Sequence, residues 1–306
     1  MSRPLVIGSR GSKLALWQAE QARLRLLELN PRIDVRIEII KTTGDIKSDP
    51  LSVIGGKGVF TKELEDALLD GRIDIAVHSL KDLPTVLPEG LSISAICERE
   101  DARDALVLRS DFAVQHASLA GLPVGAVVGT SSQRRLAQLK ALRGDVVVND
   151  LRGNVDTRIR KLDEGQYDAV LLATAGLVRL GLQERISARI SVAEMLPAVG
   201  QGAVAIETRS DNRVAVEATR KLDHRATRLA CLAERSFLRS LGGGCQFPIA
   251  AHAIVDNGSL RLDGLVARPD GSEILRDSLS APVVDAETLG SQLADRLLQQ
   301  GAASLL

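Results

Sequence analysis

Short apolar runs alternate with helical patterns from about residue 4 to residue 196, and this alternation limits the fold more than any other feature of the chain. The runs at 5–9, 35–40 and 72–80 are typical of buried strands. Helical patterns follow the first run and precede the third. Strands that alternate with helices form a parallel sheet that the helices cover. The sequence therefore predicts an α/β domain for the first part of the chain.

The same order of patterns starts again near Asp104. Strand-like runs lie at 126–132, 146–154 and 167–176, and a helical pattern follows each of the first two. We therefore expect a second α/β domain of similar build. The segment 197–209 contains one further strand-like run.

From about His224 the pattern changes. A helical pattern at 225–241 precedes three strand-like runs, and a last helix ends near Gln300. The pair Asn257-Gly258 between the first two runs is a strong signal for a β-hairpin. These features predict a small C-terminal α+β domain with a three-stranded antiparallel sheet.

The composition excludes several classes of partner. The chain has 306 residues, which is room for two or three domains. Its 39 basic and 39 acidic residues give no net charge, so no overall field draws it to nucleic acid or to an anionic membrane. Aromatic residues make up 2%, which argues against a stacking platform for single-stranded nucleic acid. No stretch approaches the ~20 apolar residues of a membrane span.

The three cysteines, Cys97, Cys231 and Cys245, lie far apart in the sequence. Their spacing predicts neither a disulfide framework nor a metal site. Residues 1–10 carry two arginines and no apolar run, which predicts no signal peptide. The expected location is the reducing cytoplasm.

Thirty of the 39 basic residues are arginine. A GC-rich genome is the simplest explanation of this bias. Recognition of carboxylates or phosphates is the alternative, because the planar guanidinium group binds both with two parallel hydrogen bonds. The positions of the arginines along the chain must decide between the two.

The segment SRGS (9–12) lies where the first predicted strand meets a helix. Free N–H groups and the positive end of the helix dipole favour an anion there, so Arg10 and Ser12 are candidate ligand-binding residues. Taken alone, the segment is better explained by a capped helix with a solvated arginine.

Two later strand-to-helix junctions repeat this chemistry. Their candidate residues are Thr130, Ser131, Ser132, Arg134, Arg135, Arg152 and Arg158. Cations at a helix start oppose the dipole, so their recurrence needs a reason. A solvated first turn is the alternative at each junction. The C-terminal ends of parallel strands are where open α/β sheets bind ligands. Together the junctions predict a ligand with several carboxylates or phosphates.

The segment VHSLKDLP (77–84) places Lys81 and Asp82 at the end of a predicted strand. A Ser-His-Asp triad is not expected, because the spacing is too close and there is no nucleophile elbow. An ionised Asp82 beside cations could stabilise a developing positive charge. A plain turn before Pro84 explains the segment equally well.

Two glycine-rich segments are candidates for mobile parts of a site. The segment GGKG (55–58) lacks the spacing of a phosphate-binding loop and is more plausible as a lid. Cys245 follows three glycines in GGGCQFP (242–248), where a thiol is accessible. Attachment of a prosthetic group is the functional hypothesis for Cys245, and an ordinary loop cysteine is the alternative.

Together these segments resemble the porphobilinogen deaminase family, also called hydroxymethylbilane synthase. The resemblance covers nearly the whole chain. The matching motifs, in chain order, are SRGSKLA, GGKGVFTKELE, DIAVHSLKDLP, ICEREDARDA, VGTSSQRR, LRGNVDTRIRKL, LPAVGQGA and GGGCQFPI.

The resemblance implies three domains. Two α/β domains similar to the lobes of a type II periplasmic binding protein would precede a small α+β domain that carries the cofactor cysteine. The first would comprise residues 1–99 and 203–220, the second 103–197 and the third 225–306.

The resemblance also implies an activity. Family members deaminate porphobilinogen and join four molecules head to tail into hydroxymethylbilane, releasing ammonia, and they act as monomers. A dipyrromethane primer would be bound by a thioether to Cys245, and Asp82 would be the catalytic carboxylate. The implied cofactor-binding residues are Lys81, Thr130, Ser131, Ser132, Arg134, Arg135 and Arg158. The implied substrate-binding residues are Arg10, Ser12, Arg152 and Arg179.

A non-catalytic, two-lobed protein that binds small anions is the competing hypothesis, because a fold does not determine a function. Cys245 discriminates between the two, since a binding protein has no need of a modified thiol.

Overall fold

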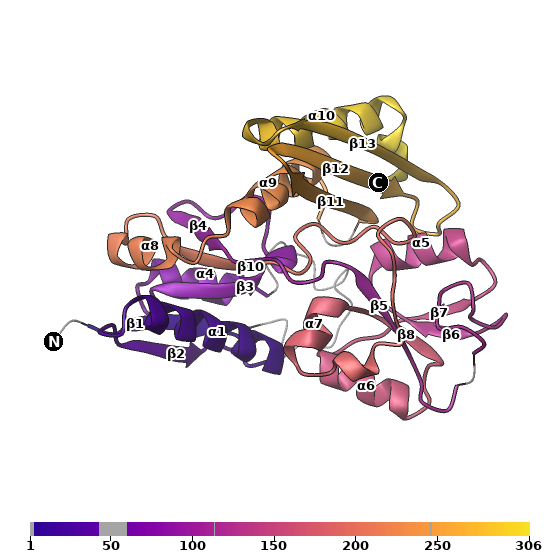
Figure 1. Ribbon diagram of the computed structural model, residues 1–306, viewed down its shortest axis with the longest axis horizontal. Helices are drawn as coiled ribbons and strands as arrows, with labels where there is room; N and C mark the ends of the chain where they lie inside the picture. The colour runs from indigo at the N-terminus through magenta and orange to yellow at the C-terminus, as the bar shows by residue number, and fades with distance from the viewer. Residues whose placement is uncertain (1–2, 43–59, 113, 245–246) are drawn as a thin grey trace. The chain divides into compact units, whose positions relative to one another are not determined.

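The computed structural model describes residues 3–42, 60–112, 114–244 and 247–306 (Figure 1). By their internal contacts the residues divide into two compact units. Unit 1 consists of Met1–Glu100 with Ala203–Arg228, and unit 2 consists of Asp101–Gly202 with Leu229–Leu306.

Unit 1 is built on a five-stranded sheet in the order β2-β1-β3-β10-β4. Its strands are β1 (Leu5–Ser9), β2 (Val35–Ile39), β3 (Ile75–Ser79), β4 (Leu91–Ile96) and β10 (Val204–Arg209). β1 pairs in parallel with β2 and β3, whereas β10 runs antiparallel to β3 and β4. The predicted parallel arrangement of the first three strands is therefore confirmed. β10 follows the whole second sheet in the chain, so unit 1 is discontinuous.

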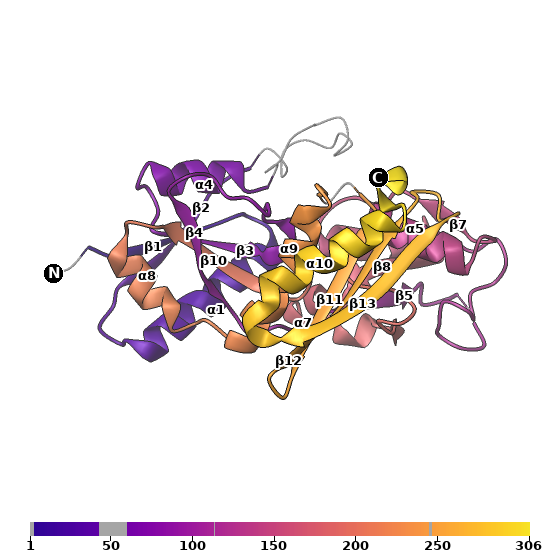
Figure 2. The ribbon, with the colours of Figure 1, turned by 90° about the horizontal axis from the view of Figure 1, so that it is seen from above.

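Three helices cover the two faces of this sheet (Figures 1 and 2). They are α1 (Lys13–Leu29), α4 (Lys62–Leu69) and α8 (Arg213–Arg220). α1 and α8 share a buried cluster with Ile75 and Val77 of β3. α4 packs with Ala76 in a separate cluster. Because side chains alternate along a strand, α4 lies on the opposite face from the other two helices.

A second five-stranded sheet, in the order β7-β6-β8-β5-β9, belongs to unit 2. Its strands are β5 (Asp104–Leu108), β6 (Val127–Gly129), β7 (Val147–Asn149), β8 (Ala169–Ala173) and β9 (Ala188–Arg189). β6 is parallel to β7 and β8, and β5 is antiparallel to β8 and β9. The order of strand directions therefore repeats that of the first sheet. The helices that follow its strands are α5 (Gln133–Leu142), α6 (Val155–Asp163) and α7 (Thr174–Arg179).

The C-terminal part of unit 2 contains an antiparallel sheet in the order β11-β12-β13. Its strands are β11 (Ile249–Asp256), β12 (Ser259–Ala267) and β13 (Ile274–Pro282). Asn257 and Gly258 have φ of 47° and 81°, the signs that a two-residue hairpin turn requires, so the predicted hairpin is confirmed. α9 (Arg225–Ser240) and α10 (Ala286–Gln299) pack on the sheet, with Phe237 fully buried between them and the strands.

Short 3₁₀ turns complete the described chain. They are η1 (Leu80–Asp82), η2 (Gln183–Arg185), η3 (Val283–Asp285) and η4 (Ala302–Leu305). Among the described residues, no helix is long and apolar enough to cross a membrane. The expected α/β class is confirmed by the two helix-covered five-stranded sheets, and the expected C-terminal α+β part by the three-stranded antiparallel sheet with its helices.

Gly290 of α10 tests the packing of the C-terminal helices. A Cβ at this position would lie 2.3 Å from the carbonyl oxygen of Ala233 on α9, which is backbone and cannot rotate away. Gly290→Ala should therefore push the helices apart and lower the free energy of unfolding by about 1–3 kcal/mol. Urea denaturation measures the change. Ser291→Ala, one residue along on the solvent side, is the control and should stay close to the wild type; equal stability of both variants would contradict the close packing.

Candidate active site

The functional candidates of unit 1 follow two neighbouring parallel strands. Arg10 and Ser12 come directly after β1, and Lys81 and Asp82 lie in the turn η1 after β3. β1 and β3 pair in parallel, with Gly8 opposite Ala76. The carboxyl ends of these strands therefore meet at one edge of the sheet, where such sheets bind ligands.

Ser12 caps α1, as its sequence context predicts: its hydroxyl oxygen accepts a hydrogen bond from the backbone N–H of Ala15 at 3.3 Å. The Arg10 guanidinium lies over the ring of Phe60, with its central carbon 4.3 Å from the ring centre. This contact holds the half-buried Arg10 side chain at the helix start by a cation–π interaction.

The turn that carries Lys81 and Asp82 is fixed by its neighbours. The backbone N–H of Leu80 donates to the carbonyl oxygen of Ala203 at 3.0 Å, and that of Leu83 donates to Leu80 at 3.1 Å. The side chains of Leu80 and Leu83 are buried. Within the described part of the chain, no residue pairs with the half-buried carboxylate of Asp82, so it is available for a ligand.

In unit 2, the hydroxyl residues follow β6 and surround the start of α5. Ser132 accepts a hydrogen bond from the backbone N–H of Arg135 at 3.4 Å and so caps the helix. Thr130 Oγ1 accepts from the backbone N–H of Ser132 at 3.2 Å. The hydroxyl hydrogens of Thr130 and Ser132 reach no described acceptor, so both can serve a ligand. Ser131 is used internally, since its hydroxyl donates to the carbonyl oxygen of Leu151.

Arg134 and Arg135 are not at the surface, although the sequence analysis assigned them to a ligand. Both side chains are buried and pair with the fully buried carboxylate of Asp104, each with an N···O distance of 2.7 Å. Arg134 Nη1, which also donates to Asp104, donates to the carbonyl oxygen of Leu196, and Arg135 Nη1 donates to that of Leu171. Asp104 therefore stabilises the two cations that oppose the helix dipole. Direct binding of a ligand by these two arginines stays a prediction.

The cluster of Asp104, Arg134 and Arg135 carries one negative and two positive charges. Burial acts to raise the pKa of Asp104, but the two guanidinium charges and their hydrogen bonds outweigh it and hold the pKa well below its usual range. Burial also lowers the pKa of Arg134. With both arginines charged, the buried cluster keeps one uncompensated positive charge. Such a fixed charge favours an anion at the neighbouring edge of the sheet.

The other candidate arginines of unit 2 make local contacts. Arg152 Nε donates to Asp150 at 2.6 Å, and Arg158 Nε donates to the carbonyl oxygen of Gly153 at 2.7 Å. Both side chains are only half-buried. Arg179 Nη2 donates to the carbonyl oxygen of Gly202 at 2.6 Å. The structure thus places Arg152 and Arg158 after β7 in the same edge region as Thr130, because β7 and β6 are parallel.

Two predicted features fall outside the described residues: Cys245, and the segment 55–58 expected as a lid. The other two cysteines, Cys97 and Cys231, are not joined in a disulfide bond. No group of histidine, cysteine and acidic residues in the described part of the chain has the arrangement of a metal site.

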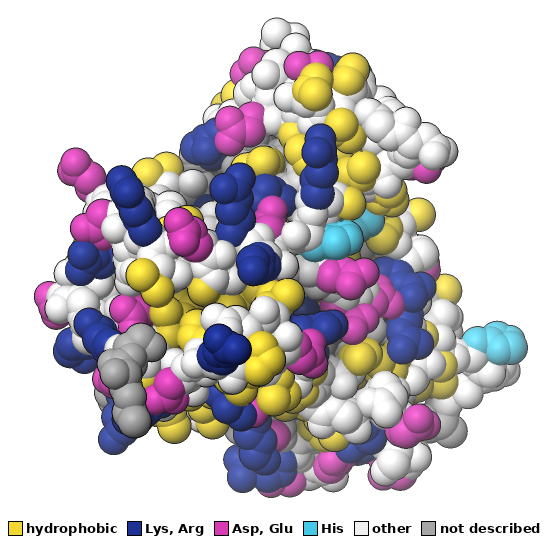
Figure 3. Space-filling view, turned by 60° about the vertical axis from the view of Figure 1, so that its left-hand side comes forward, with side chains coloured by type: hydrophobic (Ala, Val, Ile, Leu, Met, Phe, Trp, Pro, Cys, Tyr) yellow, Lys and Arg dark blue, Asp and Glu magenta, His cyan; other side chains and the backbone are white. Residues whose placement is uncertain are grey.

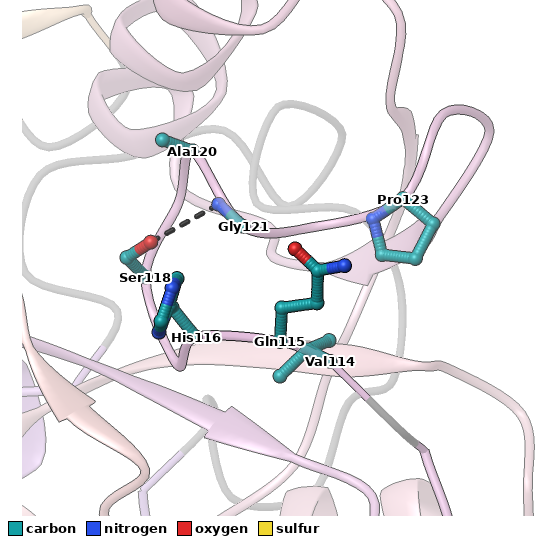
Figure 4. A pocket seen from close by; sticks show the side chains of 7 residues that line it. All are labelled: Val114, Gln115, His116, Ser118, Ala120, Gly121 and Pro123. Carbon is teal, nitrogen blue, oxygen red and sulfur yellow. Dashed lines mark hydrogen bonds between the residues drawn. The ribbon is translucent and has the colours of Figure 1, made fainter.

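Figure 4 shows a surface pocket in the loop between Val114 and Pro123. Ser118 Oγ accepts a hydrogen bond from the backbone N–H of Gly121 there and holds the loop. None of the residues that line this pocket is a candidate from the sequence. Figure 3 shows basic and acidic side chains interspersed on the face it presents, as expected for a chain without net charge.

Sequence reasoning missed Asp104 and Gln201. Gln201 Nε2 donates to Asp104 at 2.8 Å and to the carbonyl oxygen of Ala102 at 2.7 Å. Asp104 opens an otherwise apolar strand, and an acid at such a position signals an internal partner. Nothing in the sequence identifies that partner, which lies 30 positions away at Arg134.

Asp104→Asn tests the charge balance of the cluster. Without the carboxylate, two buried guanidinium groups lose their counter-charge, so the free energy of unfolding at pH 7 should fall by about 3–5 kcal/mol. The pKa of Asp104 is lower in the folded state than in the unfolded state. Its contribution to the free energy of unfolding is therefore fully present above about pH 3.9, the pKa of an unfolded aspartate, and is lost as the pH falls through the folded-state pKa. The difference between variant and wild type should therefore shrink below about pH 4.

Urea denaturation at several pH values measures this difference. Asp111→Asn is the control, since Asp111 pairs with an arginine at the surface, and it should leave unfolding unchanged. A variant at Asp104 as stable as the wild type at pH 7 would contradict the account of the cluster.

Comparisons with known proteins identify the family of the chain. Residues 5–217 match the family model described as porphobilinogen deaminase, dipyromethane cofactor binding domain, and residues 228–299 match the porphobilinogen deaminase C-terminal domain. The chain is 51% identical over 303 residues to the porphobilinogen deaminase of Chromobacterium violaceum, covering 99% of this chain and 96% of that protein. It is 51% identical over 305 residues to that of Pelobacter propionicus, with the same coverage.

Among solved structures, the periplasmic VFT2 domain of Bordetella pertussis BvgS is similar over 72% of this chain and 85% of that one, with 18% identity and a TM-score of 0.41. The family models account for both α/β domains and for the C-terminal domain. The chain belongs to the porphobilinogen deaminase family.

Proposed function

We propose that this chain deaminates porphobilinogen and joins four molecules head to tail into hydroxymethylbilane, with release of ammonia. Each pyrrole of that product carries two carboxylates, so the growing chain is a polyanion. The observation that carries the proposal is the uncompensated positive charge of the Asp104 cluster beneath the edge that holds Thr130 and Ser132. This edge offers charge and hydrogen-bond donors to a ligand with several carboxylates.

The residues present fit a dipyrromethane cofactor. Its carboxylates need donors, and the hydroxyls of Thr130 and Ser132 follow β6 at the same sheet edge at which the half-buried Arg152 and Arg158 follow β7. When bound, the dipyrromethane supplies the first acceptor ring. We assign its covalent attachment to Cys245 by a thioether.

The remaining roles divide between the units. We assign cofactor binding to Lys81, Thr130, Ser131, Ser132, Arg134, Arg135 and Arg158, and substrate binding to Arg10, Ser12, Arg152 and Arg179. For Arg134 and Arg135 the buried position supports an electrostatic contribution, because Asp104 and backbone carbonyls already accept from the terminal nitrogens of both guanidinium groups.

Asp82 is the catalytic carboxylate in this proposal. Loss of ammonia from porphobilinogen leaves a positive charge on the exocyclic carbon and the pyrrole ring. The carboxylate can stabilise this charge and can accept and return a pyrrole proton. Its place in a turn anchored by the buried Leu80 and Leu83 means that it is oriented before the substrate arrives.

Asp82→Asn should lower turnover by about a thousandfold, since a charge pair ~4 Å apart at an effective dielectric of about 20 contributes roughly 4 kcal/mol. Porphobilinogen consumption under saturating substrate measures kcat. The thermal unfolding midpoint should stay that of the wild type, because no described residue pairs with this carboxylate. A kcat within threefold of the wild type would refute the catalytic role.

Cys245→Ser should abolish attachment of the primer, because the hydroxyl of serine is a far weaker nucleophile than a thiolate. The mass of the denatured protein should exceed the chain mass by two linked pyrrole units in the wild type only. Cys97→Ser is the matched control and should keep the added mass. Added mass on the Cys245 variant would contradict the assignment.

The two α/β domains alone would also suit a non-catalytic protein that binds small anions. That alternative is not favoured, because the family match extends over residues 228–299, beyond the two lobes. We further propose that the enzyme acts as a cytoplasmic monomer without nucleic acid or membrane as a partner. The lack of a disulfide bond between Cys97 and Cys231 and the absence of net charge support this.

A further inference from the structure

A buried side-chain pair lies directly behind the turn that carries Lys81 and Asp82. His78 Nε2 of β3 is 3.0 Å from Glu207 Oε2 of β10, and the two side chains are 3% and 0% exposed. Both residues belong to unit 1. The proposed reaction uses neither of them directly, so the presence of this buried pair needs another explanation.

The layer around this pair is acidic. Glu65 of α4 is also buried, and burial, reinforced by the carboxylates of Glu207 and Asp66, raises the pKa of Glu65 above its usual range. Across the described residues, no lysine or arginine forms an ion pair with Glu65 or Glu207. The ring of His78 is therefore the partner of Glu207 Oε2, while Oε1 has no partner among the described residues, and removing the ring would leave a buried carboxyl group without any partner.

The pair lies near the point where the pairing of β3 with β10 ends. Ala205 is opposite His78, Val204 is opposite Ser79, and the backbone N–H of Leu80 makes one more bond to Ala203. Beyond that bond the chain turns into η1. The hydrogen bond between His78 and Glu207 thus connects the two strands through their side chains, and His78 lies four residues before Asp82.

Side chains on both faces hold this strand end. On the face of α4, His78 meets Glu207. On the face of α1, Gln18 Nε2 donates to Ser79 Oγ at 3.0 Å. A hydrogen bond is directional, whereas apolar packing tolerates small displacements. The hydrogen bond of His78 can therefore restrict the position of the strand end more than apolar side chains of the same size could.

We propose that His78 is a positioning residue for the reaction: its bond to Glu207 fixes the end of β3 and thereby the placement of Lys81 and Asp82. The proposal rests on the proposed function, because it concerns the placement of the catalytic carboxylate. A shift of the carboxylate by about 1 Å is enough to lower turnover by about a hundredfold.

The test separates positioning from stability. The double variant His78→Leu/Glu207→Leu removes the directional bond together with both of its partners, so neither stays behind as an unpaired buried group, and it should fold with near wild-type stability. Glu207→Gln keeps the size and an amide that can still bond the ring. Thr208→Val is the control, since Thr208 is equally buried in β10 but points to the other face.

The measurements are the thermal unfolding midpoint, the intact mass, and kcat and KM for porphobilinogen. We expect the double leucine variant to keep its unfolding midpoint and its primer while kcat falls by about 10- to 100-fold and KM changes by less than about threefold. Glu207→Gln and Thr208→Val should keep kcat within about threefold of the wild type.

A double leucine variant with wild-type kcat would overturn the inference. If the double variant does not fold, Glu207→Asp is the deciding variant. Its shorter side chain keeps the carboxylate but draws the His78 ring toward β10. An unchanged kcat in Glu207→Asp would also overturn the inference. A wild-type chain that does not consume porphobilinogen would overturn the proposed function and this inference with it. Fully active variants of an active wild type would overturn the inference alone.

Discussion

The stability of unit 2 depends most on the ion pairs of the buried Asp104 carboxylate. It compensates two guanidinium groups at the start of α5, and Gln201 joins it from the far end of the same unit. A helix that begins with two arginines is unfavourable by its dipole, and an internal acid removes that penalty. The cluster also leaves one positive charge in place beneath a row of hydroxyl groups. The stability of the unit and the anion binding that we propose for it would therefore have the same physical origin.

Much of the fold could be predicted from the sequence. β1, β3 and β8 are buried on both faces of their sheets, so each appears as a short apolar run bounded by polar residues. The turn at Asn257 and Gly258 was predictable because few residues adopt a positive φ. β9 has only two residues, which is too few for a local signal. α8 is amphipathic and buries Ala215 and Thr219, but its eight residues make only about two turns, so its periodicity is short. The pairing of β10 with β3 joins residues more than 120 positions apart, which no local pattern reveals.

The site was predictable in part, for the same reasons. Asp82 and Lys81 stand at a strand end in a recognisable motif, and the structure places them at the edge of the sheet beside Arg10 and Ser12. The role of Arg134 and Arg135 could not be predicted, because a guanidinium group that faces a ligand and one that faces an internal acid have the same local sequence. The hydrogen bond between His78 and Glu207 could not be predicted either. In the sequence each residue is an isolated polar side chain in an apolar strand, and only the register of β3 with β10 brings the two together.

The central claim is that this chain builds its product by successive additions of porphobilinogen to a covalently held primer. The most direct test is the intact mass of the denatured protein after mixing with a limited amount of porphobilinogen. The account predicts a series of masses above the resting protein, each higher by one porphobilinogen less one ammonia, that disappears when excess substrate allows release of the product. A protein whose mass stays constant after mixing, although the substrate is present, would contradict it.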